Sequence, residues 1–169
     1  LAVWVATHRR AARYATSPAR FGLTYEEIRF PSAHADRVPL AGWLVPCEGA
    51  RGLVLLCHGI GSTRMRMLGK ARRLHRMGYA SLILDFRARG ESGGTHCTLG
   101  LRESDDILGA VAYLRSRPDT AALRLFGLGE SLGAASLVLA MAREPRIEAA
   151  VLEACFATMR AAVERRLRY

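Results

Sequence analysis

Two kinds of hydrophobic pattern alternate along most of the chain. Runs in which nearly every residue is apolar predict strands buried on both faces, at 52–57, 79–86, 123–128 and 146–153. Apolar residues at helical spacing predict helices around Met67, Ala71 and Leu74, around Ile107, Val111 and Leu114, and over 132–141 and 158–168. Buried strands that alternate with helices indicate a mostly parallel sheet covered by helices on both faces. The expected fold class is therefore α/β.

The N-terminal part of the chain has a different pattern. Two short strand-like stretches, at 23–30 and 38–45, flank a polar loop and predict an antiparallel strand pair. We expect the Trp43 ring to pack in the core or on a sheet face. Residues 1–22 are predicted to be a lead-in segment. Its first six residues are apolar and a basic stretch follows, as at the trailing end of an upstream membrane anchor or signal segment.

Length and composition fit a single globular domain after this lead-in. The chain has 169 residues, of which 50% are hydrophobic, enough to bury a sizeable core. Neither a repeat nor a linker separates a second domain, so we assign residues 23–169 to one domain. No apolar run reaches the length of a transmembrane helix.

The formal charge of +10 raises the question of a nucleic-acid partner. Lys70 is the only lysine, and the arginines are scattered along the whole chain. Basic residues interleaved with aromatic ones, which single-strand binding favours, do not occur. We therefore expect no nucleic-acid partner. An arginine-driven nucleic-acid binder is a minor alternative, which predicts retention on DNA with a steep salt dependence.

The four cysteines give no sign of a metal site. Cys47, Cys57, Cys97 and Cys155 form neither a C-x-x-C pair nor a cysteine and histidine spacing suited to zinc. Cys57 and Cys155 lie in apolar strand patterns, so we expect them to be small buried hydrophobic residues. The cysteines are expected to be reduced.

The most informative stretch is Gly129-Glu130-Ser131-Leu132-Gly133, a G-x-S-x-G motif between a strand pattern and a helix pattern. A strand that turns into a helix within one residue strains the backbone of that residue and crowds the positions two before and two after it. Glycine relieves the crowding because it has no β-carbon. The motif predicts that Ser131 is a nucleophile at the top of the sheet, with the Leu132 N–H directed toward a developing oxyanion.

Other polar residues are given structural interpretations. Glu103, Asp105 and Asp106 open a predicted helix, where carboxylates favour the helix dipole, so we do not interpret them as an acid–base pair. His96 lies in a glycine-rich loop that could face the site, but we expect a solvated loop histidine.

Taken together, the motifs resemble those of the α/β-hydrolase superfamily over residues 20–160. In order along the chain they are His58-Gly59, Asp85-Phe86-Arg87 with Gly90-Glu-Ser-Gly93, Glu103 to Asp106, and Gly129-x-Ser131-x-Gly133. The segment 21–27, Gly42-Trp43 and Glu153-Ala-Cys-Phe156 resemble more narrowly the Bem46-type serine hydrolases, which are often membrane-anchored.

The resemblance implies a role for each matching position. Ser131 would be the nucleophile, and the N–H groups of Leu132 and Ile60 would form the oxyanion hole. His58 would shape the oxyanion loop, and Asp85 would organise neighbouring loops. The resemblance implies neither an organic cofactor nor a metal ion, and it implies a small acyl compound as the substrate.

The sequence departs from the family pattern in one respect. The family's catalytic triad runs in the order serine, acid, histidine, but no histidine follows Ser131 in this chain. We expect the acid and the histidine to lie outside the chain, with Glu153 as an alternative acid. The domain would then be incomplete at its C-terminus, with its last strands missing, and inactive alone. Its final strand would expose an apolar edge, so that the isolated chain would self-associate. The usual insertion point of a lid follows Glu153.

The functional hypothesis is a serine hydrolase that cleaves an ester, thioester or amide through an acyl-enzyme at Ser131. The alternative is a non-catalytic protein of the same fold that binds a partner or a small ligand.

Overall fold

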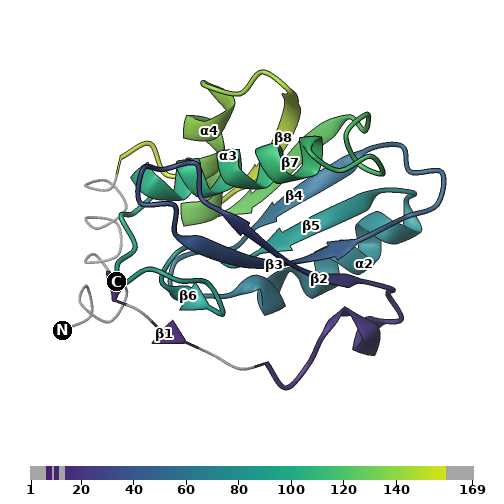
Figure 1. The fold of residues 1–169 in the computed structure, drawn as a ribbon, viewed down its shortest axis with the longest axis horizontal. Helices are drawn as coiled ribbons and strands as arrows, with labels where there is room; N and C mark the ends of the chain where they lie inside the picture. The colour runs from purple at the N-terminus through teal and green to yellow at the C-terminus, as the bar shows by residue number, and fades with distance from the viewer. Residues whose placement is uncertain (1–6, 9, 12–13, 159–169) are drawn as a thin grey trace.

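A six-stranded mixed sheet forms the centre of the computed structural model, which describes residues 7–8, 10–11 and 14–158 (Figure 1). The strands lie in the order β2-β3-β5-β4-β7-β8. Their bounds are β2 Glu26–Pro31, β3 Pro39–Val45, β4 Leu53–Cys57, β5 Ala80–Leu84, β7 Leu125–Glu130 and β8 Ile147–Glu153. Two short strands, β1 (Arg10–Ala11) and β6 (Arg89–Gly90), pair with each other in parallel outside this sheet.

Helices cover both faces of the sheet, as the hydrophobic pattern predicts. The helical segments are η1 Pro18–Phe21, η2 Arg64–Met67, α2 Leu68–Arg76, α3 Leu101–Arg115 and α4 Leu132–Met141. Buried residues of α3 and α4 join one core cluster with the sheet, and buried residues of η2 and α2 join a second (Figure 1). The sheet therefore has an apolar core on each side.

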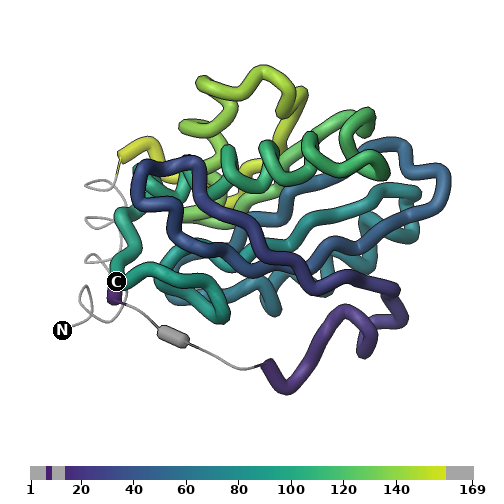
Figure 2. The backbone as a smooth tube through the Cα atoms, in the orientation of Figure 1, coloured from purple at the N-terminus to yellow at the C-terminus, as the bar shows by residue number. Residues whose placement is uncertain are grey.

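The antiparallel pair predicted near the N-terminus is confirmed. β2 pairs antiparallel with β3, from Glu26 opposite Leu44 to Pro31 opposite Pro39. β3 in turn runs antiparallel to β5, whereas β5, β4, β7 and β8 are mutually parallel. Trp43 is buried on β3, as expected. Figure 2 shows the segment from residue 14 to β2 as a purple tube along the lower edge of the molecule.

The central strands and α4 match the hydrophobic pattern closely, although several boundaries differ from it by one or two residues. β4 and β5 are buried at every position. β7 extends to Glu130, two residues beyond the predicted run, so strand and helix are separated by Ser131 alone. The helix expected directly after Ser62 or Thr63 begins as the 3-10 turn η2, and Thr63 makes no side-chain cap there.

The last strand contradicts the expectation of burial. In β8 only Ile147 is buried, and Val151 and Leu152 are 58% and 40% exposed. Cys155, expected to be a buried hydrophobic residue, is exposed because it lies beyond the end of β8. The physical reason is position: β8 is an edge strand, and no described element covers its outer side. Two apolar side chains on this edge strand are thus exposed among the described residues, and the self-association expected from such an edge stays a prediction.

The acidic residues of α3 are structural, but not mainly through the helix dipole. Glu103 accepts hydrogen bonds from the backbone N–H groups of Thr98 at 2.8 Å and Gly100 at 2.7 Å, and so caps the helix. Asp106 is buried and pairs with the buried guanidinium of Arg87, which donates from Nη2 to Oδ1 at 2.8 Å. This pair fastens α3 to the loop after β5.

Two expectations fall largely outside the described residues, namely the apolar segment 1–6 and the helix at 158–168. Within the described part of the chain, no helix combines the length and the apolar character that a membrane crossing requires.

The buried ion pair gives a test of the fold. Asp106→Asn leaves the buried Arg87 charge without its main partner, so we expect the free energy of unfolding to fall by about 3 kcal/mol. The adjacent variant Asp105→Asn, which removes a partly exposed pair with Arg143, is expected to cost less than about 1 kcal/mol. Urea unfolding measures both, and equal losses would contradict this assignment.

Candidate active site

Ser131 occupies the single residue between β7 and α4. Its backbone has φ 50° and ψ −108°, a strained conformation for a residue with a side chain. Two backbone hydrogen bonds hold it there. The Ser131 N–H donates to the Glu153 carbonyl oxygen at 2.8 Å, and the Ser131 carbonyl accepts from Ala135 N–H at 3.0 Å. The strand, turn and helix around the motif are thus as the sequence predicts.

The two glycines of the motif are required by close contacts between backbones. A β-carbon at Gly133 would lie 2.1 Å from the carbonyl oxygen of Cys57, at the end of β4. A β-carbon at Gly129 would lie 2.5 Å from the backbone nitrogen of Ala134. Neither position can hold a larger residue without moving backbone. The first turn of α4 therefore sits directly on the end of β4.

The loop after β4 lies against the same turn. A β-carbon at Gly59 would be 3.6 Å from the Ser131 Cβ and 3.5 Å from the Glu130 carbonyl oxygen. Ile60 follows in this loop, and Leu132 begins α4, where backbone N–H groups have no partner within the helix. The backbone segments that carry Ser131, Leu132 and Ile60 therefore lie together beyond the carboxyl ends of β4 and β7.

His58 joins two loops and is not available as a base. Its side chain is fully buried, with Nδ1 2.8 Å from the Gly59 carbonyl oxygen, and its Nε2 accepts from the Phe86 N–H at 3.2 Å. An acceptor at Nε2 places the ring proton on Nδ1. Burial lowers the pKa of His58 below its usual value, so the ring is neutral. This agrees with a role in shaping the loop.

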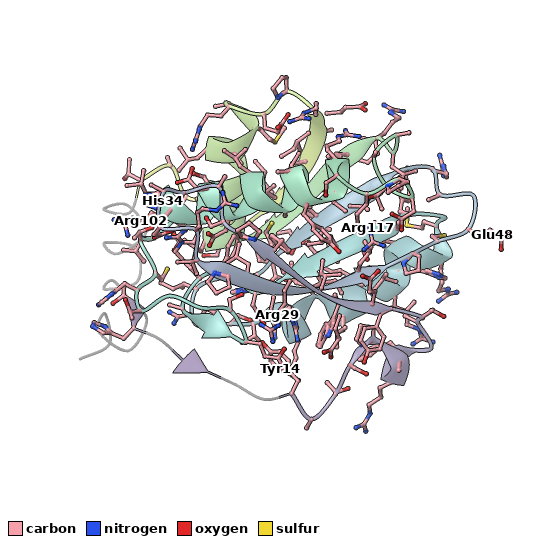
Figure 3. All side chains as sticks on the ribbon, viewed as in Figure 1. Tyr14, Arg29, His34, Glu48, Arg102 and Arg117 are labelled. Carbon is pink, nitrogen blue, oxygen red and sulfur yellow. The ribbon has the colours of Figure 1, made fainter. Side chains whose placement is uncertain are left out.

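Asp85 ties three distant segments together, as the sequence interpretation suggests. Its carboxylate accepts from Arg64 N–H at 2.8 Å, from Glu91 N–H at 3.2 Å and from the Tyr14 hydroxyl at 2.6 Å. Tyr14 belongs to the segment before β2 and is labelled in Figure 3. Burial and the negative charge of Asp85 raise the pKa of Tyr14, so the hydroxyl stays protonated and donates.

Sequence reasoning missed Arg64, whose side chain is buried beside Asp85. Its guanidinium lies 4.1 Å from the centre of the Trp43 ring and 4.8 Å from that of Tyr14. It donates from Nη2 to Glu91 Oε2 at 2.7 Å. A single arginine in a basic chain carries no pattern that distinguishes it from the exposed ones.

A charged cluster, also missed, surrounds the turn on the α2 side. Lys70 of α2 donates hydrogen bonds to Glu130 Oε1 and, at 3.0 Å, to Glu153 Oε2. Arg66 Nε lies 4.0 Å from Glu130 Oε2. Glu153, the alternative acid, is thus paired with Lys70, and its side chain is 45% exposed.

His96 lies in an exposed loop, as expected. It shares a hydrogen bond with Thr95 Oγ1 at 2.7 Å, and its ring packs edge-on against His8 at 4.7 Å between centroids. Among the residues that the structure describes, no group of three or more histidine, cysteine or acidic side chains is placed to hold a metal ion.

The contact at Gly133 predicts that alanine has opposite effects on stability at two glycines, Gly133 and Gly69, each of which is the second residue of its helix. Gly133→Ala forces a methyl group into the Cys57 carbonyl, so we expect a loss of about 3 kcal/mol or more. In Gly69→Ala, on α2, the methyl group meets no atom within 4 Å, so we expect a gain of up to about 1 kcal/mol. Thermal unfolding of the two variants measures the difference, and equal effects would argue against the close approach.

The buried His58 predicts a pH dependence of stability. Because its pKa is lowered in the folded state, the unfolded chain binds a proton more readily as the pH falls through about 6.5. We expect the free energy of unfolding to decrease between about pH 7 and pH 5, and the slope to be shallower in His58→Gln. Denaturant titrations at each pH measure the slopes, and identical slopes would show that His58 is not responsible.

Known proteins share this fold and part of this sequence. The structure of the Pyrococcus furiosus esterase Pf2001 superposes with a TM-score of 0.84, covering 95% of this chain and 63% of the esterase at 26% identity. An alpha/beta hydrolase from Novosphingobium aromaticivorans superposes with a TM-score of 0.61, covering 76% of this chain and 43% of that one at 26% identity.

Sequence relatives are longer than this chain. An uncharacterized protein of Mycobacterium tuberculosis is 34% identical over 113 residues, which are 65% of this chain and 40% of the relative. The chain spans less than half the length of this relative. The narrower likeness to Bem46-type hydrolases stays a prediction.

The model of the serine aminopeptidase S33 family matches residues 48–168, which include β4, the Ser131 turn and β8. The chain therefore belongs to this family of α/β hydrolases.

Proposed function

We propose that this chain is the nucleophile-bearing part of a serine hydrolase that cleaves an ester, thioester or amide, with an ester as the first candidate. The observation that carries the proposal is the backbone of Ser131. Its strained conformation at the β7–α4 junction is the geometry that presents a nucleophilic serine at the end of a sheet. Family membership and the likeness to an esterase support it.

The reaction would proceed by acyl transfer. The Ser131 hydroxyl attacks the carbonyl carbon, a histidine base takes its proton, and the carbonyl oxygen becomes an oxyanion. The N–H groups of Leu132 and Ile60 stabilise that oxyanion. The leaving group then departs with a proton from the histidine, and water hydrolyses the acyl-enzyme.

The base and its acid come from residues outside the chain in this proposal. His58 is occupied on both ring nitrogens, and no histidine follows Ser131. Relatives of greater length are compatible with such residues. A serine hydroxyl without a base is a poor nucleophile at neutral pH, so the 169-residue chain alone should be nearly inactive.

Two serines of the same segment provide a matched test in the full-length protein. Ser131→Ala is expected to lower the hydrolysis of an activated ester by about a thousandfold or more, because it removes the attacking atom. Ser136→Ala removes a buried hydroxyl that donates to the Leu132 carbonyl at 2.8 Å, and should keep most of the activity.

Labelling by a fluorophosphonate probe, with the modified residue located by mass spectrometry, gives a second readout. We expect the probe on Ser131 in the full-length protein and little labelling of the isolated chain. Undiminished hydrolysis by Ser131→Ala would overturn the proposal. A folded full-length protein that neither hydrolyses esters nor takes the probe would favour the non-catalytic alternative.

A further inference from the structure

Lys70, the single lysine of the chain, lies between the carboxylates of Glu130 and Glu153. Lys70 donates hydrogen bonds to Glu130, the residue before Ser131, and to Glu153, whose own carbonyl accepts the Ser131 N–H. One ammonium group thus links α2 to the ends of β7 and β8. Nothing in the G-x-S-x-G motif requires either carboxylate or the lysine.

We propose that Lys70 is a positioning residue for the reaction at Ser131, because it neutralises Glu130 and Glu153 and fixes them beside the strained turn. The inference rests on the proposed serine-hydrolase function.

Charge balance is the first argument. Glu130 and Glu153 carry two negative charges, and Lys70 and Arg66 supply two positive ones. Without Lys70 the cluster would carry a net charge of −1 beside the position where the proposed oxyanion forms. Like charges in a partly buried site repel each other, so the uncompensated carboxylate would oppose the transition state more than substrate binding.

The electrostatic influence of Glu130 extends to the oxyanion loop. Burial lowers the pKa of His58, which heads the loop that contains Ile60, and the negative charge of Glu130 opposes this shift as one of its smaller contributions. The Lys70 ammonium is itself well held. Burial works against its charge, but the hydrogen bonds to Glu130 and Glu153 outweigh this and raise the pKa of Lys70.

Position is the second argument. The end of β8 accepts the Ser131 N–H, yet within residues 14–158 β8 is an edge strand whose last residues are exposed. Hydrogen bonds from Lys70 to the side chains of Glu130 and Glu153 hold the two strand ends together. A strained backbone persists only where its surroundings fix it, and this pairing is one such constraint.

Three variants in the full-length protein test the proposal kinetically. Lys70→Met should lower kcat for ester hydrolysis about tenfold while KM changes less than about twofold, since the lost interaction acts on the transition state. Lys70→Arg keeps the charge and should restore most of kcat. Arg73→Met, which removes an exposed cation from the same helix, should behave as wild type.

A double variant separates charge from packing. If the uncompensated carboxylate slows the reaction, adding Glu130→Gln to Lys70→Met should raise kcat again. We expect the double variant to recover at least half of the loss in log kcat that Lys70→Met causes. Thermal unfolding establishes that each variant is folded. Equal kcat in Lys70→Met and Arg73→Met, or no recovery in the double variant, would overturn the proposal.

The single lysine allows one measurement that does not depend on activity. Amine-specific acetylation, followed at Lys70 by mass spectrometry at fixed pH, proceeds through the neutral amine. Glu130→Gln and Glu153→Gln should each speed acetylation severalfold, because each removes a group that favours the ammonium form. Unchanged rates would show that the pairing is absent.

The Ser131 and Lys70 variants fail in distinguishable ways. If Ser131→Ala keeps its activity, the proposed serine-hydrolase function is wrong. If Ser131→Ala loses activity but Lys70→Met keeps the kcat of the wild type, only the role of Lys70 is wrong.

Discussion

The contact between Gly133 and the end of β4 is the constraint on which the candidate site depends. Because no β-carbon separates α4 from the Cys57 carbonyl, the helix can start with only Ser131 between it and the end of β7. That short junction forces the backbone of Ser131 into its strained conformation and brings the loop after β4 against the turn. A looser junction would relax the serine and separate the segments that carry the predicted oxyanion donors.

The polar residues around the site divide into two groups with different tasks. Asp85, His58 and the Arg87–Asp106 pair lie inside the protein and bind mainly backbone groups or each other, so they fix loop positions. Glu130, Glu153 and Lys70 are partly exposed and adjust the charge near Ser131. The first group holds the loops of the site in position. The second group determines the charge close to the proposed oxyanion.

Much of this architecture was accessible from the sequence because it depends on repeating patterns. The buried strands β4 and β5, the helix α4 and the glycine spacing around Ser131 each involve several residues that agree with one another. The environment of β8 was not accessible, since an apolar run does not reveal whether a neighbour covers it, and Cys155 was misjudged for the same reason. Arg64 and Lys70 are isolated residues whose partners lie far away in the sequence, so their contacts leave no periodic pattern along the chain.

The Tyr14 hydroxyl on Asp85 has a consequence for how the protein can be divided. The sheet begins only at β2, yet the carboxylate that holds the loop after β4 takes one of its donors from a residue twelve positions earlier. A version of the protein that started at β2 would contain every strand of the six-stranded sheet but would leave Asp85, which is fully buried, with one donor fewer. The lead-in segment therefore helps to hold the loop after β4 in place. The part of the chain that the candidate site needs begins before β2.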